Sequence, residues 1–499
     1  MARTGDIGVA AATAIGVGGM MGAGLYTLVG LAAHTAGVWI WASFLVGGVV
    51  SVFSVYSYAK LGARYPSRGG AAEFLIRCFG DSLVAGGLNI FQFLGWIIAM
   101  ALYATGFSGY VLHLVRHEGS AWVGKAIGVG LVLFLMGANF IGAKAVGRAE
   151  LVVVGIELVI IVGFVVAAAL RATPSNFSED TGGDGLLGML IAAGLLYVTY
   201  EGFGVVTNSA GNMADPRKQL PRAMYLALGI VVTVYVVVAI MILMVLPLAI
   251  VEANAGHVLS EAGRAAAGQA GFIIIGVAAL LATASGVNAT LYGNANLAYT
   301  VAKTGEMPAD FARGVWRSGT WGLVAAAALT CLFVVAFPLS SVGQMASMAF
   351  LIVYGAVSFG HLRVRRETGA RAPLLIASVV LNAGLFALLL YYSVTEGSTA
   401  AATTLLLVLV ASFAFEYAYR RATGRRLRVA AQCAGDVAQD GLDDDDALRP
   451  TKAAERRVAL GVRLAAVRGD LHIAQVIRVV GMEHGAVGHG AGQVGAEAA

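Results

Sequence analysis

Twelve mostly apolar stretches follow one another along the chain, separated by short polar segments. Their bounds are 7–31, 36–59, 83–114, 123–142, 149–170, 186–210, 222–250, 271–302, 321–338, 341–361, 373–394 and 400–420. A run of about 18 or more apolar residues is long enough to cross a bilayer as an α-helix. The first stretch is too long for a cleaved signal peptide, and no small-residue cleavage site follows it. The pattern therefore predicts an all-α integral membrane protein with twelve transmembrane helices.

The composition agrees with this pattern and excludes a soluble globular domain. Of the 499 residues, 59% are hydrophobic and 12% are charged, and the mean hydropathy is +0.80, whereas a soluble domain has about 25% charged residues. The three cysteines, Cys78, Cys331 and Cys433, show no CxxC spacing, so we expect neither a disulfide framework nor a metal site. The net charge of +5 is not gathered in one domain, so we expect no nucleic acid partner.

The basic residues are distributed unevenly between alternate loops. If the N-terminus is cytoplasmic, the inside segments hold 22 Lys and Arg residues, and the outside loops hold only Arg116, Lys125, Arg171 and Arg264. Cytoplasmic loops of membrane proteins carry the excess of positive charge. We therefore expect a multi-pass protein of the cell membrane, embedded in the lipid bilayer, with both termini in the cytoplasm.

The composition changes after the last apolar stretch. Residues 422–499 are polar and include the acidic run "DGLDDDD" and a Gly-, His- and Ala-rich end. Their apolar runs are too few to bury a core alone. We therefore expect two parts, a twelve-helix domain at 1–421 and a partly disordered cytoplasmic tail at 422–499.

The first apolar stretch is unusually rich in glycine. "GVGGMMGAGLYTLVG", residues 16–30, contains six glycines, and each costs a helix interior about 1 kcal/mol relative to alanine. One interpretation is close helix packing through the Gly18–Gly22 GxxxG pair, which this stretch taken alone favours slightly. The other is an unwound segment whose freed amides bind a ligand, since irregular backbone at membrane depth survives only in protein or around a cavity.

The sixth stretch changes the balance between these interpretations. It contains "YVTYEGFGVVTNSAGN", with Gly202 and Gly204 in mid-span. Transporters built from inverted repeats have interrupted helices at corresponding positions of their two halves. Helices 1 and 6 are five helices apart, so the pattern predicts a 5+5 inverted repeat with both helices broken at a midplane site. Helices 11 and 12 lie outside this repeat.

Four motifs resemble the amino acid–polyamine–organocation superfamily, and in particular its prokaryotic amino acid permeases. They are "GMMGAGLY", "YAKLGARYPSRGGAAEFL", "YEGFGVVTNSAGNMADPRKQLPRAM" and "NATLYGNANLAYTVAKTGEMPADFAR", in family order across residues 1–421. The resemblance implies a leucine-transporter-type fold that moves amino acids by alternating access, with proton coupling. In the tail, "GDLHIAQVIRVV" is faintly similar to part of a universal stress protein domain and is too short to be the whole domain.

The resemblance also implies a substrate site at the two interruptions. A helix N-terminus suits a carboxylate, and unwound carbonyls suit an ammonium. By resemblance, the carboxylate is bound by amides near Met21, Gly22, Ala23, Gly24 and Leu25, and the ammonium by carbonyls near Val198, Thr199 and Glu201. Ala23 replaces a serine of many relatives, which removes one hydroxyl contact. Gly202 permits close approach of the backbone. Tyr200 and Phe203 flank the break, where plain packing is their alternative role.

Two carboxylates within the spans need an explanation, because charge at membrane depth is costly. Glu157 lies mid-way along helix 5, where many relatives carry a lysine, and it is a candidate proton carrier or cation ligand. The alternative is a pair with a buried basic group, but no mid-span Lys or Arg is available for it. Glu201 lies in the break of helix 6 and faces either the substrate or cavity water. Gln92 and Ser285 are weaker site candidates, since interhelical hydrogen bonding also accounts for them.

These features predict a secondary active transporter that imports amino acids and needs no cofactor. The coupling ion is H⁺, with Na⁺ as the alternative. An exchanger, or a nutrient sensor on the same fold with the tail as its output, remains an alternative function. A channel is disfavoured because no ring of repeated polar loops is present. No nucleophile–base pair or metal cluster points to an enzyme.

Overall fold

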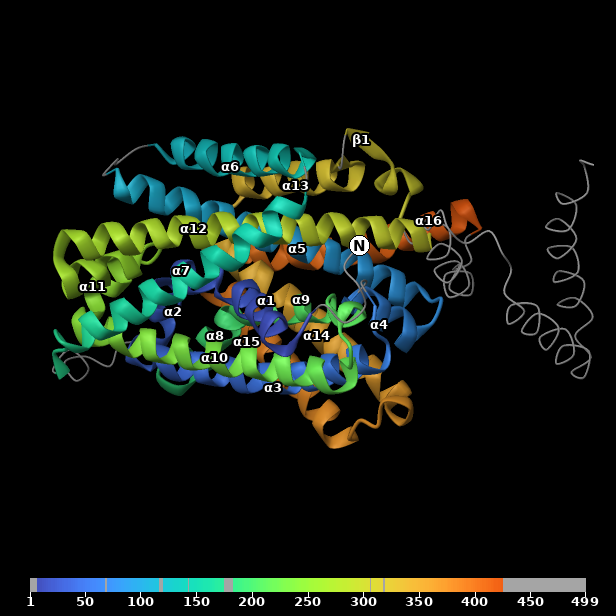
Figure 1. The fold of residues 1–499 in the computed structure, drawn as a ribbon, viewed down its shortest axis with the longest axis horizontal. Coiled ribbons are helices and arrows are strands. Elements are labelled where there is room, and N and C mark those ends of the chain that lie inside the picture. Colours follow the sequence, from blue (N-terminus) through green and yellow to red (C-terminus); the bar gives the residue numbers. More distant parts are fainter. Residues whose placement is uncertain are drawn as a thin grey trace, which may run out of the picture. The chain divides into compact units, whose positions relative to one another are not determined.

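The computed structural model describes residues 7–67, 70–115, 120–141, 143–174, 183–305, 307–316 and 319–424. All of these belong to one compact unit, Met1–Leu427. The predicted tail at 422–499 lies outside the described residues, apart from its first three positions. Helices dominate the described part of the chain (Figure 1).

The described helices follow one another from α1 to α16 along the chain. The first eight are α1 (Val9–Met21), α2 (Ala23–Ala36), α3 (Ile40–Arg64), α4 (Gly70–Phe79), α5 (Leu83–Leu114), α6 (Ala121–Ile141), α7 (Ala143–Ala169) and α8 (Gly185–Leu196). The others are α9 (Phe203–Thr207), α10 (Pro216–Val245), α11 (Leu248–Ala253), α12 (Val258–Thr304), α13 (Trp321–Ala336), α14 (Leu339–Thr368), α15 (Ala372–Thr395) and α16 (Thr399–Thr423).

Short elements connect these helices. They include the 3-10 turns η1 (Gly37–Trp39), η3 (Tyr197–Tyr200), η4 (Ala210–Asn212) and η5 (Ala309–Ala312). Two short strands, β1 (Gly314–Trp316) and β2 (Gly319–Thr320), pair antiparallel between α12 and α13.

Ten helical segments of the described chain are long and apolar enough to cross a membrane. Two further apolar helices, α1 and α13, are shorter. The expected all-α, multi-pass architecture is therefore confirmed, while the number of twelve spans stays a prediction. The eighth predicted stretch, 271–302, corresponds to the longer part of α12, which also has a first part that begins at Val258. Its first turns are separated from the rest by a kink at Ala267 and Gly268, where Gly268 has φ +67°. The early turns are too polar to have been counted in an apolar run.

Both predicted helix interruptions are present. The first helix stops at Met21 and restarts at Ala23, and Gly22 between them has φ −42° and ψ −131°. The sixth stretch is helical to Leu196 and continues as the 3-10 turn η3. After Glu201 and Gly202, α9 begins.

The interrupted helices lie inside the bundle. The segments differ in the buried share of their most apolar 18 residues. This share is 78% in α5, in Gly185–Asn212 and in α14, but only 11% in α6. In the middle of Figure 1, α1 lies beside α9 and α10, and both neighbours contact it. Helices α5 and α14 therefore lie inside the bundle with the second break, whereas α6 presents most of its surface outward.

Candidate functional site

The two interruptions are in direct contact with each other. Gly202 packs against the backbone of Gly19 and Met20. On the other side of the first break, a Cβ added at Gly24 would lie 2.7 Å from Thr199 Cγ2 and 2.9 Å from Thr199 Cα. Glycine is therefore required at both contacts, because any side chain would push the two segments apart. The glycines of the first stretch therefore have both predicted roles. Gly22 interrupts the helix, and its neighbouring glycines permit close packing.

The first break exposes the N-terminal end of α2 within the protein interior. Gly22 is the N-cap and has no side chain to occupy the first amides of α2. The first four N–H groups of a helix have no partner within it, and the helix dipole makes this end positive. Met21 and Leu25, on either side of these amides, are fully buried. The candidate amides at Gly22–Leu25 therefore form a site suited to an anion, directly beside Thr199.

The carbonyls of the second break are held by side chains from neighbouring helices. The Tyr354 hydroxyl of α14 donates to the Glu201 carbonyl at 2.7 Å. Ser347, also on α14, accepts from the Val198 amide at 3.2 Å and donates to the Leu195 carbonyl at 2.5 Å. Non-helical backbone at membrane depth needs such partners. The polar residues of α14 thus support the 3-10 turn η3 and the break after it from one side.

Tyr235 of α10 connects both interruptions. Its hydroxyl is 2.5 Å from the Met20 carbonyl and 3.2 Å from the Thr199 carbonyl, and the side chain is fully buried. The sequence patterns did not single out this residue. Its only signal was that it and Thr233 are the two hydroxyl residues of the otherwise apolar run "VVTVYVVVAIMILMV".

Glu201 is buried with incomplete hydrogen bonding. Its side chain is 1% exposed, and Oε1 accepts from the Tyr103 hydroxyl of α5 at 2.5 Å. Among the described residues, Oε2 has no hydrogen-bond partner. An ionised carboxylate in this setting is unfavourable, since burial of charge is costly without full pairing. Glu201 is therefore suited to hold a proton or to bind a cationic group.

Glu157 lies on α7, close to the Tyr26 hydroxyl of α2. Its side chain is 3% exposed. Neither Glu157 Oε1 nor Tyr26 Oη makes a hydrogen bond to another described residue. Within the described part of the chain, no Lys or Arg forms an ion pair with Glu157. The carboxyl is thus buried, lacks a basic partner there, and is near the helix that follows the first break.

The remaining candidates occupy different positions around the breaks. The Tyr200 hydroxyl donates to the Phe44 carbonyl of α3 at 2.7 Å. Phe203 packs with Tyr58 and Tyr354 at ring-centroid distances of 5.5 and 4.7 Å. These contacts fit the packing role for both aromatic rings.

Gln92 and Ser285 differ in their surroundings. Gln92 on α5 is buried, and its Oε1 has no hydrogen-bond partner among the described residues. Ser285 on α12 is partly exposed and precedes Gly286, whose Cα lies 3.6 Å from the place of a Cβ on Gly22. Ser285 is therefore next in sequence to a residue that contacts the first break.

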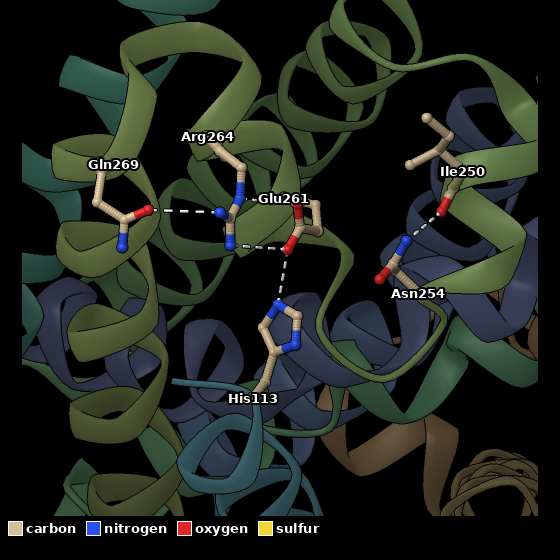
Figure 2. A network of polar contacts seen from close by, with 6 residues as sticks. All are labelled: His113, Ile250, Asn254, Glu261, Arg264 and Gln269. Carbon is tan, nitrogen blue, oxygen red and sulfur yellow. Dashed lines mark hydrogen bonds and ion pairs between the residues drawn. The ribbon is translucent and has the colours of Figure 1, made fainter. Parts of the chain in front are cut away.

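A second polar cluster lies where the first turns of α12 meet the end of α5 (Figure 2). The His113 Nε2 atom is 2.8 Å from Glu261 Oε1, and Arg264 donates from Nε to Glu261 Oε2 at 3.0 Å. The rings of His113 and His257 are 3.6 Å apart. Burial, and then the adjacent His113, lower the pKa of His257 to about 4. Since Ala255 of the segment between α11 and α12 packs against Gly30, the cluster holds this segment over α2.

Comparison with known proteins identifies the family. The sequence profile of the family described as "Amino acid permease" matches residues 7–418. The chain belongs to this family. This permease is 36% identical to an uncharacterized protein of Methanocaldococcus jannaschii, over 76% of this chain and 88% of the relative. It is 31% identical to the Escherichia coli inner membrane transport protein YbaT, over 77% and 90% of the two chains.

More distant relatives extend the comparison. The mouse cationic amino acid transporter 4 is 27% identical over 73% of this permease and 60% of the relative. The methylthioribose transporter of Bacillus subtilis is 23% identical over 75% and 85%. The resemblance to amino acid permeases inferred from four motifs is therefore confirmed, and the chain is a membrane transporter rather than an enzyme.

Proposed function

We propose that this permease is a secondary active transporter that imports amino acids by alternating access. The observation that carries the proposal is the contact between the N-terminal end of α2 and the 3-10 turn η3 at Gly24 and Thr199. An amino acid zwitterion has a carboxylate and an ammonium on one carbon. The amides of Gly22–Leu25 suit the carboxylate, and the nearby carbonyls of Val198, Thr199 and Glu201 suit the ammonium.

The proposed arrangement in the membrane has twelve spans, a 5+5 inverted repeat and both termini in the cytoplasm. Of the ten long segments, Gly24–Arg64 contains both α2 and α3. In the proposed count, α1 and α2 together make the first span, α3 makes the second, and α13 makes the ninth of twelve. α1 is half of an interrupted span, which explains its length. The distribution of 22 basic residues inside and four outside supports the orientation in the cell membrane.

We propose that transport is coupled to protons through Glu157. A buried carboxyl without a basic partner is more stable in its neutral form, because desolvation disfavours the charge. When the permease opens to water on one side, the carboxyl can exchange its proton there. A group that is protonated in one state and ionised in another links the proton gradient to transport. The alternative is coupling to Na⁺, with Glu157 as a ligand of that ion.

Uptake into proteoliposomes tests this function. Purified permease is reconstituted, and a panel of radiolabelled amino acids is offered under an imposed pH gradient, an imposed Na⁺ gradient or neither. We expect accumulation of an amino acid under the pH gradient. Accumulation with Na⁺ alone would assign Glu157 to a cation site. Exchange without accumulation under either gradient would indicate an exchanger, and binding without any flux would indicate a sensor.

A further inference from the structure

The hydroxyl of Tyr235 occupies an unusual position between the two interrupted helices. α10 runs alongside α1 and α9 (Figure 1). Its Tyr235 hydroxyl donates to one carbonyl from each break. A phenol has a single O–H to donate. The Met20 and Thr199 carbonyls therefore share one proton, at 2.5 and 3.2 Å from the same oxygen.

These two carbonyls lack the usual helical donors because the chain is interrupted just after each of them. In a continuous helix, each carbonyl accepts from the amide four residues later. For Met20 that amide would be Gly24, beyond the break at Gly22. Thr199 lies in the 3-10 turn η3, where the donor would be the amide three residues later, Gly202, or the amide of Phe203 if the turn continued as an α-helix. Among the described residues, the Gly24 amide makes no hydrogen bond to the Met20 carbonyl, and neither the Gly202 nor the Phe203 amide makes one to the Thr199 carbonyl. Tyr235 thus supplies the donor that the breaks remove.

We propose that the Tyr235 hydroxyl takes the place of the substrate ammonium when the permease is empty. This inference rests on the proposed function. An ammonium has three donors and can serve both carbonyls at once, whereas the hydroxyl divides one proton between them. Binding of an amino acid therefore displaces the hydroxyl from both carbonyls. Without substrate, the hydroxyl prevents two buried carbonyls from being left unpaired.

The consequence concerns one step of the transport cycle. Net uptake requires the empty carrier to close and reopen on the other side, whereas exchange uses only loaded carriers. Tyr235→Phe leaves the carbonyls without a donor only when the site is empty. The substitution should therefore slow the return of the empty carrier and spare the loaded carrier. It should leave the final accumulation ratio unchanged, because that ratio depends on the gradient and not on the rate.

Tyr110→Phe is the matched control. Tyr110 is also fully buried, and its hydroxyl donates to a single carbonyl, that of Tyr26, at 2.9 Å. Tyr26 lies inside α2, so its carbonyl keeps its helical donor after the substitution. The control therefore removes one buried hydroxyl without removing the donor of a carbonyl at either break.

The experiment compares exchange with net uptake in proteoliposomes for the parent, Tyr235→Phe and Tyr110→Phe. Exchange is measured with saturating amino acid on both sides, and net uptake into vesicles without internal substrate. For Tyr235→Phe we expect exchange near the parent rate and net uptake slower by about tenfold, the effect of an unpaired buried carbonyl. The accumulation plateau should be that of the parent. Tyr110→Phe should show the same ratio of exchange to net uptake as the parent.

Other results would overturn the inference. An equal fall in exchange and net uptake would make Tyr235 a structural or substrate-binding residue, and no change in either would make its hydroxyl dispensable. If Tyr235→Phe does not fold, Tyr235→His, which keeps a ring N–H donor, is measured in its place and must retain net uptake. If the parent moves no amino acid in exchange or in net uptake, the proposed function itself is wrong.

Discussion

The contact between Gly24 and Thr199 allows a quantitative prediction. A Cβ at Gly24 would lie 2.7 Å from Thr199 Cγ2, 2.8 Å from its Cβ and 2.9 Å from its Cα. Non-bonded carbon atoms are in contact at about 3.5–4.0 Å. Even alanine at this position therefore requires the Thr199 backbone to move by about 0.6 Å or more. Rotation of a side chain cannot relieve the clash, because one of the contacted atoms is a Cα.

This displacement acts directly on a carbonyl of the proposed ammonium site. A shift of about 0.6 Å lengthens a normal hydrogen bond of about 2.9 Å to the limit of hydrogen bonding. The lost bond is made to a charged group and is worth about 1.5–3 kcal/mol. Gly24→Ala should therefore weaken amino acid binding by about 10- to 100-fold. Gly24→Leu should abolish binding while the protein still inserts into the membrane.

The assay is binding of a radiolabelled amino acid to the purified permease in detergent, with thermal unfolding of each variant to verify its fold. The controls are Gly384→Ala and Gly384→Leu on α15, where an added Cβ meets no atom within 4 Å. Both controls should bind like the parent. Normal affinity in Gly24→Leu would refute the assignment of the site to the two breaks.

Three further predictions concern coupling, topology and pH. Glu157→Gln mimics the protonated carboxyl, so it should retain exchange but lose uptake driven by a pH gradient. If this variant accumulates amino acid under the pH gradient as well as the parent does, Glu157 has only a structural role. Ala253 is an exposed residue of the 251–270 segment. In a variant without the native cysteines, a cysteine at this position should react with an impermeant thiol reagent added outside the cell. Labelling only from the cytoplasm would contradict the predicted topology. His257, with its pKa lowered to about 4, is neutral when folded, so the unfolded state binds the extra proton as the pH falls below about 6.5. His257 should therefore lower the stability from pH 6.5 toward pH 4, by about 1–2 kcal/mol at pH 5. In thermal unfolding, the decrease should be smaller by this amount in His257→Asn than in the parent, and the same pH dependence in both would exclude His257 as a contributor.

Local features of the sequence were enough to establish the class of protein and the positions of the interruptions. The length of an apolar run decides whether a helix can cross a bilayer. Glycine at 22, 202 and 204 marks where regular helix is weakest, and the structure interrupts the helices at or just before these positions. The buried carboxyls Glu157 and Glu201 were likewise visible as charges within apolar runs.

The surroundings of these residues depend on the tertiary fold and could not be read from the chain. Tyr235 is 215 positions from Met20 in the chain, and Tyr103 is 98 positions from Glu201, yet each pair is hydrogen-bonded. No periodicity or motif specifies such partners, since they depend on how α5 and α10 pack against the breaks. The physical reason is that an interrupted helix loses its own hydrogen bonds. The donors that replace them come from whichever side chains the fold brings near.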